Sequence, residues 1–177
     1  MPNKKKIVIG ICGSIAAVEC IKLIRRIKKE GIDVYAAMTE SAQRIVHPDA
    51  VEWASDHPAI TNLTGRAEHV ALLGTGGFCD LLLVCPATAN TISKIANGID
   101  DTTVTTMATT AIGSNIPVVI VPAMHISLYN NPFVKENIEK LKSAGVHFIA
   151  PVICENKAKA ASNEDIAGFV IKILSEI

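Results

Sequence analysis

Four short stretches of the chain place small, hydroxyl-bearing or amide-bearing residues directly after runs of apolar residues. They read Gly-Ser-Ile-Ala at residues 13–16, Thr-Glu-Ser-Ala at 39–42, Pro-Ala-Thr-Ala-Asn at 86–90 and Pro-Ala-Met-His at 122–125. Hydroxyls and an amide supply neutral hydrogen-bond donors, and the small residues leave space for a ligand. We therefore expect a binding site for a small molecule rather than a cluster of charges.

The first two stretches suit the binding of a single phosphate. Gly13 allows the backbone to approach an anion, Ser14 adds a hydroxyl, and the first amides of a following helix would point at the anion. Thr39 and Ser41 would add two more hydroxyl donors. The G-x-G-x-x-G spacing of a dinucleotide site is absent, which argues against a nicotinamide cofactor. The alternative is that Ser14 and Thr39 only cap helices.

The third stretch suits a flat aromatic ligand. Its alanines allow a ring to lie against the backbone, and Asn90 can both donate to and accept from a heteroaromatic edge. The alternative is structural, because Asn90 and Thr91 are both good helix caps. The residues of this segment favour the two interpretations equally.

Two of the five histidines are candidates for chemistry. His69 precedes the third apolar run in a connecting segment, and His125 directly follows the fourth, so both are expected to project over the strand ends. Neither has a third histidine or a carboxylate at ligand spacing, which argues against a metal site. A G-x-S-x-G elbow is also absent, so a serine triad is not supported.

Strands and helices that alternate along the chain would bring these stretches together. The pattern predicts strands at 6–12, 32–39, 80–86, 116–122 and 146–151. It predicts helices at 15–30, 40–46, 48–55, 90–97, 101–112, 132–144 and 163–176. This alternation predicts an α/β fold of three layers, a Rossmann-like parallel sheet with helices on both faces. Ligands of such sheets bind beyond the carboxyl ends of the strands, where all four stretches fall.

Composition sets limits on the class of protein. The 177 residues, 49% of them hydrophobic, predict a single domain over residues 1–177 with a large core. Lys plus Arg and Asp plus Glu both total 17, which disfavours nucleic acid as a partner. The apolar runs fall short of the roughly 20 residues that a membrane span needs. Five cysteines without C-x-x-C spacing, and no signal peptide, predict a cytoplasmic protein with reduced thiols.

Several segments together resemble a known family. These are Gly-Ser-Ile-Ala-Ala at 13–17, the sixteen-residue block from Pro86 to Asp101, and Pro-Ala-Met-His at 122–125. They are similar to the flavoproteins that decarboxylate C-terminal cysteine groups. The similarity is greatest to the phosphopantothenoylcysteine decarboxylase family, as found in the N-terminal half of archaeal bifunctional coenzyme A enzymes. The resemblance covers nearly the whole chain, and the block that starts at Pro86 is its most specific part.

The resemblance implies a flavodoxin-type fold that binds FMN, and it assigns roles to residues. Gly13, Ser14, Ile15, Thr39 and Ser41 would hold the phosphate and the ribityl chain, whereas Thr88, Ala89, Asn90 and Thr91 would lie along the flavin. His69 matches the active-site histidine of the family. Pro122, Ala123 and Met124 match its substrate-binding motif.

The activity implied by the resemblance is decarboxylation of 4'-phosphopantothenoylcysteine to 4'-phosphopantetheine in coenzyme A biosynthesis. FMN would oxidise the thiol to a thioaldehyde, which gives the departing carboxylate an electron sink. His69 would orient the substrate or transfer a proton. The resemblance also implies a homo-oligomer built from trimers, either a trimer or a dodecamer, in which a neighbouring subunit supplies part of the pocket. The cysteine ligase of bifunctional relatives is expected on a separate chain.

Three departures from the family pattern affect these expectations. His125 stands where bacterial members have asparagine, and it is expected to contact the substrate carboxylate, with a charge that depends on pH. The loop at 74–78 lengthens the stretch after His69. Cys154 lies near the position of the reductive cysteine, where it is either the proton donor or a buried packing residue.

Two other functions remain open from the sequence. One is a flavoprotein oxidoreductase of the same superfamily, for example one that reduces a pterin, which would use His69 and His125 differently. The other is a flavin-binding protein without catalysis, such as a regulatory subunit.

Overall fold

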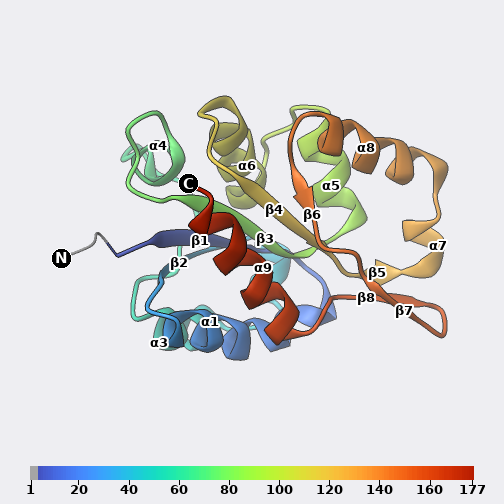
Figure 1. The fold of residues 1–177 in the computed structure, drawn as a ribbon, viewed down its shortest axis with the longest axis horizontal. Coiled ribbons are helices and arrows are strands. Elements are labelled where there is room, and N and C mark those ends of the chain that lie inside the picture. The colour runs from blue at the N-terminus through green and yellow to red at the C-terminus, as the bar shows by residue number, and fades with distance from the viewer. Residues whose placement is uncertain (1–3) are drawn as a thin grey trace.

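A computed structural model describes residues 4–177 as three layers, with a parallel sheet between two layers of helices (Figure 1). Five strands form this sheet in the order β2-β1-β3-β4-β6, and every neighbouring pair is parallel. They are β1 (Lys6–Ile11), β2 (Asp33–Met38), β3 (Leu81–Ala87), β4 (Val118–Pro122) and β6 (His147–Phe148). The predicted fold class is confirmed, although the last strand is shorter than the predicted 146–151.

Helices cover both faces of the sheet (Figure 1). One face carries α1 (Cys20–Lys29), α3 (Pro48–Ser55) and α9 (Asn163–Ser175), and the other carries α4 (Glu68–Leu73), α5 (Ala89–Ala96), α6 (Thr103–Gly113) and α8 (Pro132–Ser143). Shorter turns of helix are η1 (Ile15–Glu19), α2 (Glu40–Gln43) and α7 (Ile126–Tyr129). Within residues 4–177, no helix has the length and apolar character needed to cross a membrane.

Alternating side chains of the central strands fill two separate cores. Ile7 and Ile9 of β1 pack with α1 and α9, whereas Val8 packs with α6 on the opposite face. Both sets are fully buried, which explains why these strands read as continuous apolar runs rather than as an alternating pattern. The two cores fix the register of the sheet and hence the position of its strand ends.

The helix predicted at residues 15–30 is divided in the structure. Residues Ile15–Glu19 form the 3-10 helix η1, and the α-helix begins only at Cys20. Leu23, Ile24 and Ile27 then recur at helical spacing and are buried against the sheet. Gly31, with φ of +81°, allows the chain to turn into β2.

A second, antiparallel sheet lies beside the carboxyl end of β4 and was not predicted. It has the order β5-β8-β7, formed by β5 (Met124–His125), β8 (Lys157–Lys159) and β7 (Val152–Cys154). Strands β7 and β8 are joined by the two residues Glu155 and Asn156, and Glu155 has the positive φ of 54° that tight hairpins require. The hairpin returns the chain to the end of β4.

Candidate active site

A cavity of about 500 Å³ lies at the carboxyl ends of β1, β2 and β3, and we call it the hydroxyl-lined cavity. It brings together eight of the nine residues that the sequence assigned to cofactor binding: Gly13, Ser14, Thr39, Ser41, Thr88, Ala89, Asn90 and Thr91. The ninth, Ile15, is 77% exposed and lines a neighbouring cavity instead. The strand ends therefore converge as the parallel sheet predicts.

The turn between β1 and η1 provides a free hydroxyl at this cavity. Ser14 is the N-cap residue of η1, but its side chain makes no capping hydrogen bond. Thr39 differs, because its hydroxyl accepts a hydrogen bond of 3.2 Å from the N–H of Ala42 and so caps α2. The capping interpretation therefore holds for Thr39 and fails for Ser14, whose hydroxyl is available to a ligand.

The turn between β3 and α5 divides its polar groups between structure and cavity. Thr88 accepts a hydrogen bond of 3.2 Å from the N–H of Thr91, and thereby caps α5. The two threonine hydroxyls also lie 3.1 Å apart. Asn90 is exposed at the cavity, and its amide has no hydrogen-bond partner among residues 4–177. Thr88 thus performs the capping that the sequence assigned to Asn90 and Thr91, which leaves Asn90 for a ligand.

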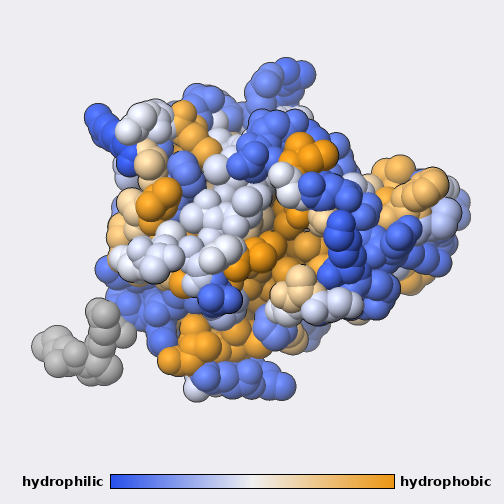
Figure 2. Space-filling model, turned by 90° about the horizontal axis from the view of Figure 1, so that it is seen from above, coloured by the Kyte–Doolittle hydropathy of each residue, from blue (hydrophilic) through white to orange (hydrophobic). Residues whose placement is uncertain are grey.

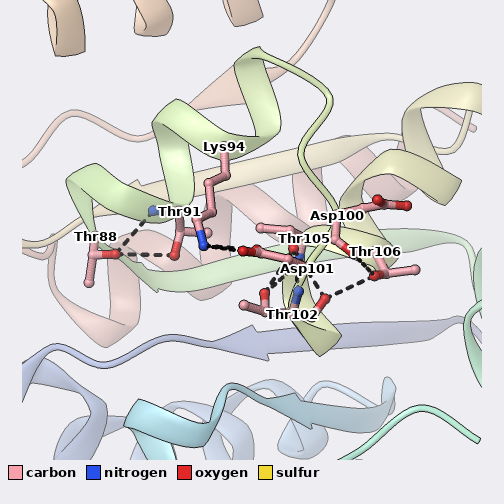
Figure 3. Close-up of polar contacts among 8 residues, drawn as sticks. All are labelled: Thr88, Thr91, Lys94, Asp100, Asp101, Thr102, Thr105 and Thr106. Carbon is pink, nitrogen blue, oxygen red and sulfur yellow. Dashed lines mark hydrogen bonds and ion pairs between the residues drawn. The ribbon is translucent and has the colours of Figure 1, made fainter.

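The sequence did not point to Lys94, Thr102 and Thr105, which also line the hydroxyl-lined cavity. Lys94 points from α5 toward Asp101, and its Nζ lies 2.6 Å from the carboxylate (Figure 3). Thr102 and Thr105 form a capping box at the start of α6. The block from Pro86 to Asp101 contains both partners of this ion pair. The structure adds that the turn after α5 brings Asp101 back to Lys94, so the ion pair lies at one side of the cavity.

A second cavity, of about 610 Å³, adjoins the first, and we call it the apolar cavity. The two share Ser14, Ala123 and Met124. Its other walls come from η1, the start of α1, strand β8 and the start of α9. A ligand in the hydroxyl-lined cavity would therefore have direct contact with one in the apolar cavity.

The stretch from Pro122 to His125 lies where the two cavities meet. Pro122 ends β4, and the N–H of Ala123 donates a hydrogen bond of 3.0 Å to the carbonyl of Ala87 at the end of β3. His125 lines the apolar cavity, and its Nδ1 accepts a hydrogen bond of 3.2 Å from the N–H of Ser127. Because Nδ1 accepts, Nε2 carries the hydrogen of the neutral ring and can donate it to an anion.

Cys154 is exposed on β7, so the interpretation of this residue as buried packing is wrong. It pairs directly with Lys157 of β8, and Lys157 pairs with His125 of β5. Residues directly opposite in antiparallel strands project to the same face. Cys154, Lys157 and His125 therefore form one row across the small sheet, with Cys154 and His125 about 10 Å apart at two strand spacings.

His69 lies apart from these groups, and the expectation that it projects over the strand ends of its own chain is wrong. It is in the first turn of α4 and lines neither cavity. The carbonyl of Leu72 on the same helix accepts a hydrogen bond from Cys79, just before β3 begins, so α4 packs at the amino end of the strand. Strand β3 is about 23 Å long, which exceeds the reach of a histidine. Nδ1 of His69 is buried without a hydrogen-bond partner.

The buried thiols are not candidates for nucleophiles. Burial raises the pKa of Cys12, directly before Gly13, to about 12, so this thiol stays protonated at neutral pH. Burial likewise raises the pKa of Cys79 to about 12. In the described part of the chain, no group of three or more His, Cys, Asp or Glu residues is placed to hold a metal ion.

A parallel sheet with helices on both faces and a hydroxyl-lined cavity at its strand ends defines a Rossmann-like α/β protein of the flavodoxin type. The model of the protein family named Flavoprotein matches residues 1–175 of this chain. The chain belongs to the Flavoprotein family.

Individual relatives agree with this assignment. A protein of Thermococcus kodakarensis, named coenzyme A biosynthesis bifunctional protein CoaBC, is 57% identical over 171 residues, which cover 96% of this chain and 42% of that protein. The chain thus spans less than half the length of this relative. The solved structure of peptidyl-cysteine decarboxylase EpiD is 27% identical, with a TM-score of 0.81 over 96% of this chain and 99% of that one. The predicted resemblance to cysteine-decarboxylating flavoproteins is confirmed.

A solved structure of a PPC decarboxylase variant, complexed with pantothenoylaminoethenethiol, has the same fold. It is 22% identical and has a TM-score of 0.81 over 98% of this chain and all of that one.

Proposed function

We propose that residues 1–177 form a single FMN-binding domain that decarboxylates 4'-phosphopantothenoylcysteine to 4'-phosphopantetheine in the cytoplasm. The observation that carries this proposal is the junction of two cavities at Ala123 and Met124, one rich in hydroxyls and the other mainly apolar. The first suits a cofactor and the second a substrate that must touch it. The name of the 57% identical relative, coenzyme A biosynthesis bifunctional protein, supports the choice of pathway.

The residues of the hydroxyl-lined cavity fit FMN. Gly13, Ser14 and Ser41 offer two hydroxyls and a close backbone approach for the phosphate, beside the first amides of η1 and α2. Asn90 offers an amide to the polar edge of a flavin. The volume of about 500 Å³ lies in the usual range for a cofactor site.

The chain's own residues have defined tasks in such a reaction. FMN, when bound, would supply the thiol oxidation that gives the electrons of the broken C–C bond an acceptor. Nε2–H of His125 would donate to the substrate carboxylate and orient it. Cys154, in the same row across the small sheet, would hold the proton that the final reduction needs. Ala123 and Met124 would provide apolar contact and exclude water.

His69 requires a second copy of the chain to serve this site. It cannot reach the strand ends of its own chain, yet the family resemblance assigns it to the active site. Hydrophobic residues are exposed among hydrophilic ones on the face that carries α4, α5, α6 and α8 (Figure 2). Near His69, Val70 and Phe78 are 49% and 47% exposed. We propose that this region packs on a neighbouring subunit of a homo-oligomer and delivers His69 to that subunit's cavities.

The proposed function is tested with purified protein loaded with FMN. Incubation with 4'-phosphopantothenoylcysteine should release CO2 and give a product lighter by the mass of CO2 alone. Cys154→Ser should give a product lighter by two further hydrogens, because reduction then stops at the enethiol. Unchanged substrate with normal flavin binding would overturn the proposal. Oxidation of NADH or ferredoxin without CO2 release would instead indicate the oxidoreductase.

A matched variant distinguishes catalysis from flavin binding alone. His69→Asn should lose turnover and retain the yellow flavin, because His69 is not among the residues that line the hydroxyl-lined cavity. A binding protein without activity would lose nothing measurable with the same change.

A further inference from the structure

The turn before α4 has a backbone conformation that its residue types do not favour. Ala67, the N-cap residue of this helix, has φ of 50° and ψ of 53°, in the left-handed region. The other non-glycine residues with positive φ in the described chain are Asp56, Asn115 and Glu155. Asp and Asn adopt this conformation more readily, and Glu155 lies in a tight hairpin, whereas the methyl side chain of Ala67 can form no compensating hydrogen bond. Other contacts must therefore hold this turn.

Thr64 and Glu68 supply these contacts, and we call the pair the Thr64–Glu68 clasp. The N–H of Thr64 donates a hydrogen bond of 2.9 Å to Oε2 of Glu68, and its hydroxyl donates to Oε1 of the same carboxylate. The carbonyl of Thr64 accepts a hydrogen bond of 3.1 Å from the N–H of Ala67, and its hydroxyl accepts one of 3.2 Å from the N–H of Arg66. The clasp thus holds the strained position from both sides.

His69 directly follows the clasp and depends on it for its position. It is the second residue of a six-residue helix, which is too short to be stable by itself. Leu72 and Leu73, at the other end of the helix, are buried, whereas no side chain of the first turn is. Nδ1 of His69 is buried without a hydrogen-bond partner among the described residues. The position of the imidazole is therefore set by the backbone of the first turn.

We propose that the Thr64–Glu68 clasp positions His69 for its reaction in the cavities of the neighbouring subunit. This inference rests on the proposed function, which gives His69 a task there, and adds two positioning residues that line neither cavity. Because His69 must act across a subunit boundary, its own chain has to hold the ring in place on the surface that meets the neighbour. A displacement of about 1 Å at a reacting group can lower a rate about 100-fold, so a loosened first turn is enough to slow the reaction.

The test compares FMN-loaded wild type with Thr64→Val, Glu68→Gln and Thr64→Ser, with 4'-phosphopantothenoylcysteine as substrate. Thr64→Val keeps the shape of the side chain and removes the hydroxyl, and Glu68→Gln removes the charge that strengthens both hydrogen bonds. Each should lower kcat about 5- to 10-fold and leave KM and FMN affinity within about 2-fold of wild type. Thr64→Ser keeps the hydroxyl and should retain most of the activity. A loss in Thr64→Ser as large as in Thr64→Val would overturn the proposal.

Two further variants test whether the effect belongs to the clasp. The double variant Thr64→Val, Glu68→Gln should have a kcat close to that of the slower single variant, because both changes weaken the same pair. Glu139→Gln is the matched control. This exposed carboxylate on α8 also accepts a hydrogen bond on a helix surface, from Lys142 at 2.7 Å, and it lines neither cavity. It should change neither kcat nor KM. Losses that add in the double variant, or an equal loss in Glu139→Gln, would contradict a role of the clasp.

A labelling measurement separates this inference from the proposed function, because it needs no turnover. Diethyl pyrocarbonate acylates histidine rings, and peptide mass spectrometry gives the rate for each histidine of the FMN-loaded protein. In Thr64→Val the rate at His69 should rise at least about 3-fold, since the loosened turn exposes the ring, and the rate at His147 should not change. This result would support the clasp even where decarboxylation fails. An unchanged rate at His69, or a raised rate together with a normal kcat, would overturn the proposal.

Discussion

Gly13 and Ser41 lie so close that a Cβ built on Gly13 would be 2.4 Å from the Cβ of Ser41. This contact joins the turn after β1 to the first residues of α2, on either side of the proposed phosphate position. Any larger residue at position 13 would have to separate the two turns. The distance between the hydroxyls of Ser14 and Ser41, the donors for a phosphate, thus depends on having glycine, which has no Cβ, at position 13.

Gly13→Ala should lower FMN affinity by at least about 10-fold, because the added methyl group would displace Ser41 from its place beside Ser14. Quenching of flavin fluorescence during titration measures the change. Gly168→Ala is the matched control, since a Cβ at this position in α9 has no atom within 4 Å. It should leave affinity intact and slightly raise the free energy of unfolding. Equal affinity for Gly13→Ala and wild type would contradict the assignment of this turn.

Coexpression of the His69→Asn chain with the Gly13→Ala chain should give a mixed oligomer that is active. In a mixed oligomer, a flavin-loaded His69→Asn chain can receive an intact His69 from a neighbouring Gly13→Ala chain. Random pairing at a head-to-tail interface predicts about one quarter of wild-type activity. Each variant expressed alone should be nearly inactive at an FMN concentration that fills the wild-type cavity but not the Gly13→Ala cavity. Activity of the mixture equal to the sum of the separate variants would show that His69 does not act across a subunit boundary.

Only one of the five cysteines should react with a thiol reagent in the native protein at pH 8. Cys154 is exposed, whereas the other four are buried. Burial raises the pKa of both Cys12 and Cys79 to about 12, so their thiols remain protonated far above pH 8. Titration with a chromogenic disulfide should release one equivalent from wild type and none from Cys154→Ser. All five thiols should react after denaturation.

Thr64→Ala should raise the pKa of Glu68, the residue before His69. The hydroxyl and the N–H of Thr64 donate hydrogen bonds to this carboxylate and hold its pKa at about 2, against an ordinary value of 4.5. Because folding lowers this pKa, its contribution to stability is present above pH 4.5 and is lost as pH falls toward 2. NMR titration of the Glu68 carboxyl carbon measures the change. A titration midpoint that stays near 2 in Thr64→Ala would contradict this role of the hydroxyl.

The central fold was predictable because its signals are local and strong. Ile7, Val8 and Ile9 belong to a run buried on both faces, and Ser162 before Asn163 is a normal helix start. The same signals explain why eight of the nine candidate cofactor residues line one cavity, since the carboxyl ends of parallel strands must meet at one edge.

The small sheet and the place of His69 were not predictable for physical reasons. Strand β5 has two residues and β8 has three, too few for an alternating pattern to be distinguished from a loop. His69 belongs to a six-residue helix whose position follows from packing against α6, which the sequence does not show. The sequence also does not show that Lys94 lines the cavity, because the turn that places Asp101 beside Lys94 is a feature of the folded chain.

The small sheet shares no strand with the central one, although it carries His125, Lys157 and Cys154. It can therefore separate from the body of the protein without breaking any hydrogen bond of the five-stranded ladder, at a fraction of the free energy of global unfolding. Its amide hydrogens should exchange with deuterium long before those of β1 and β3. Such an opening would let substrate enter and product leave while the five-stranded sheet stays intact.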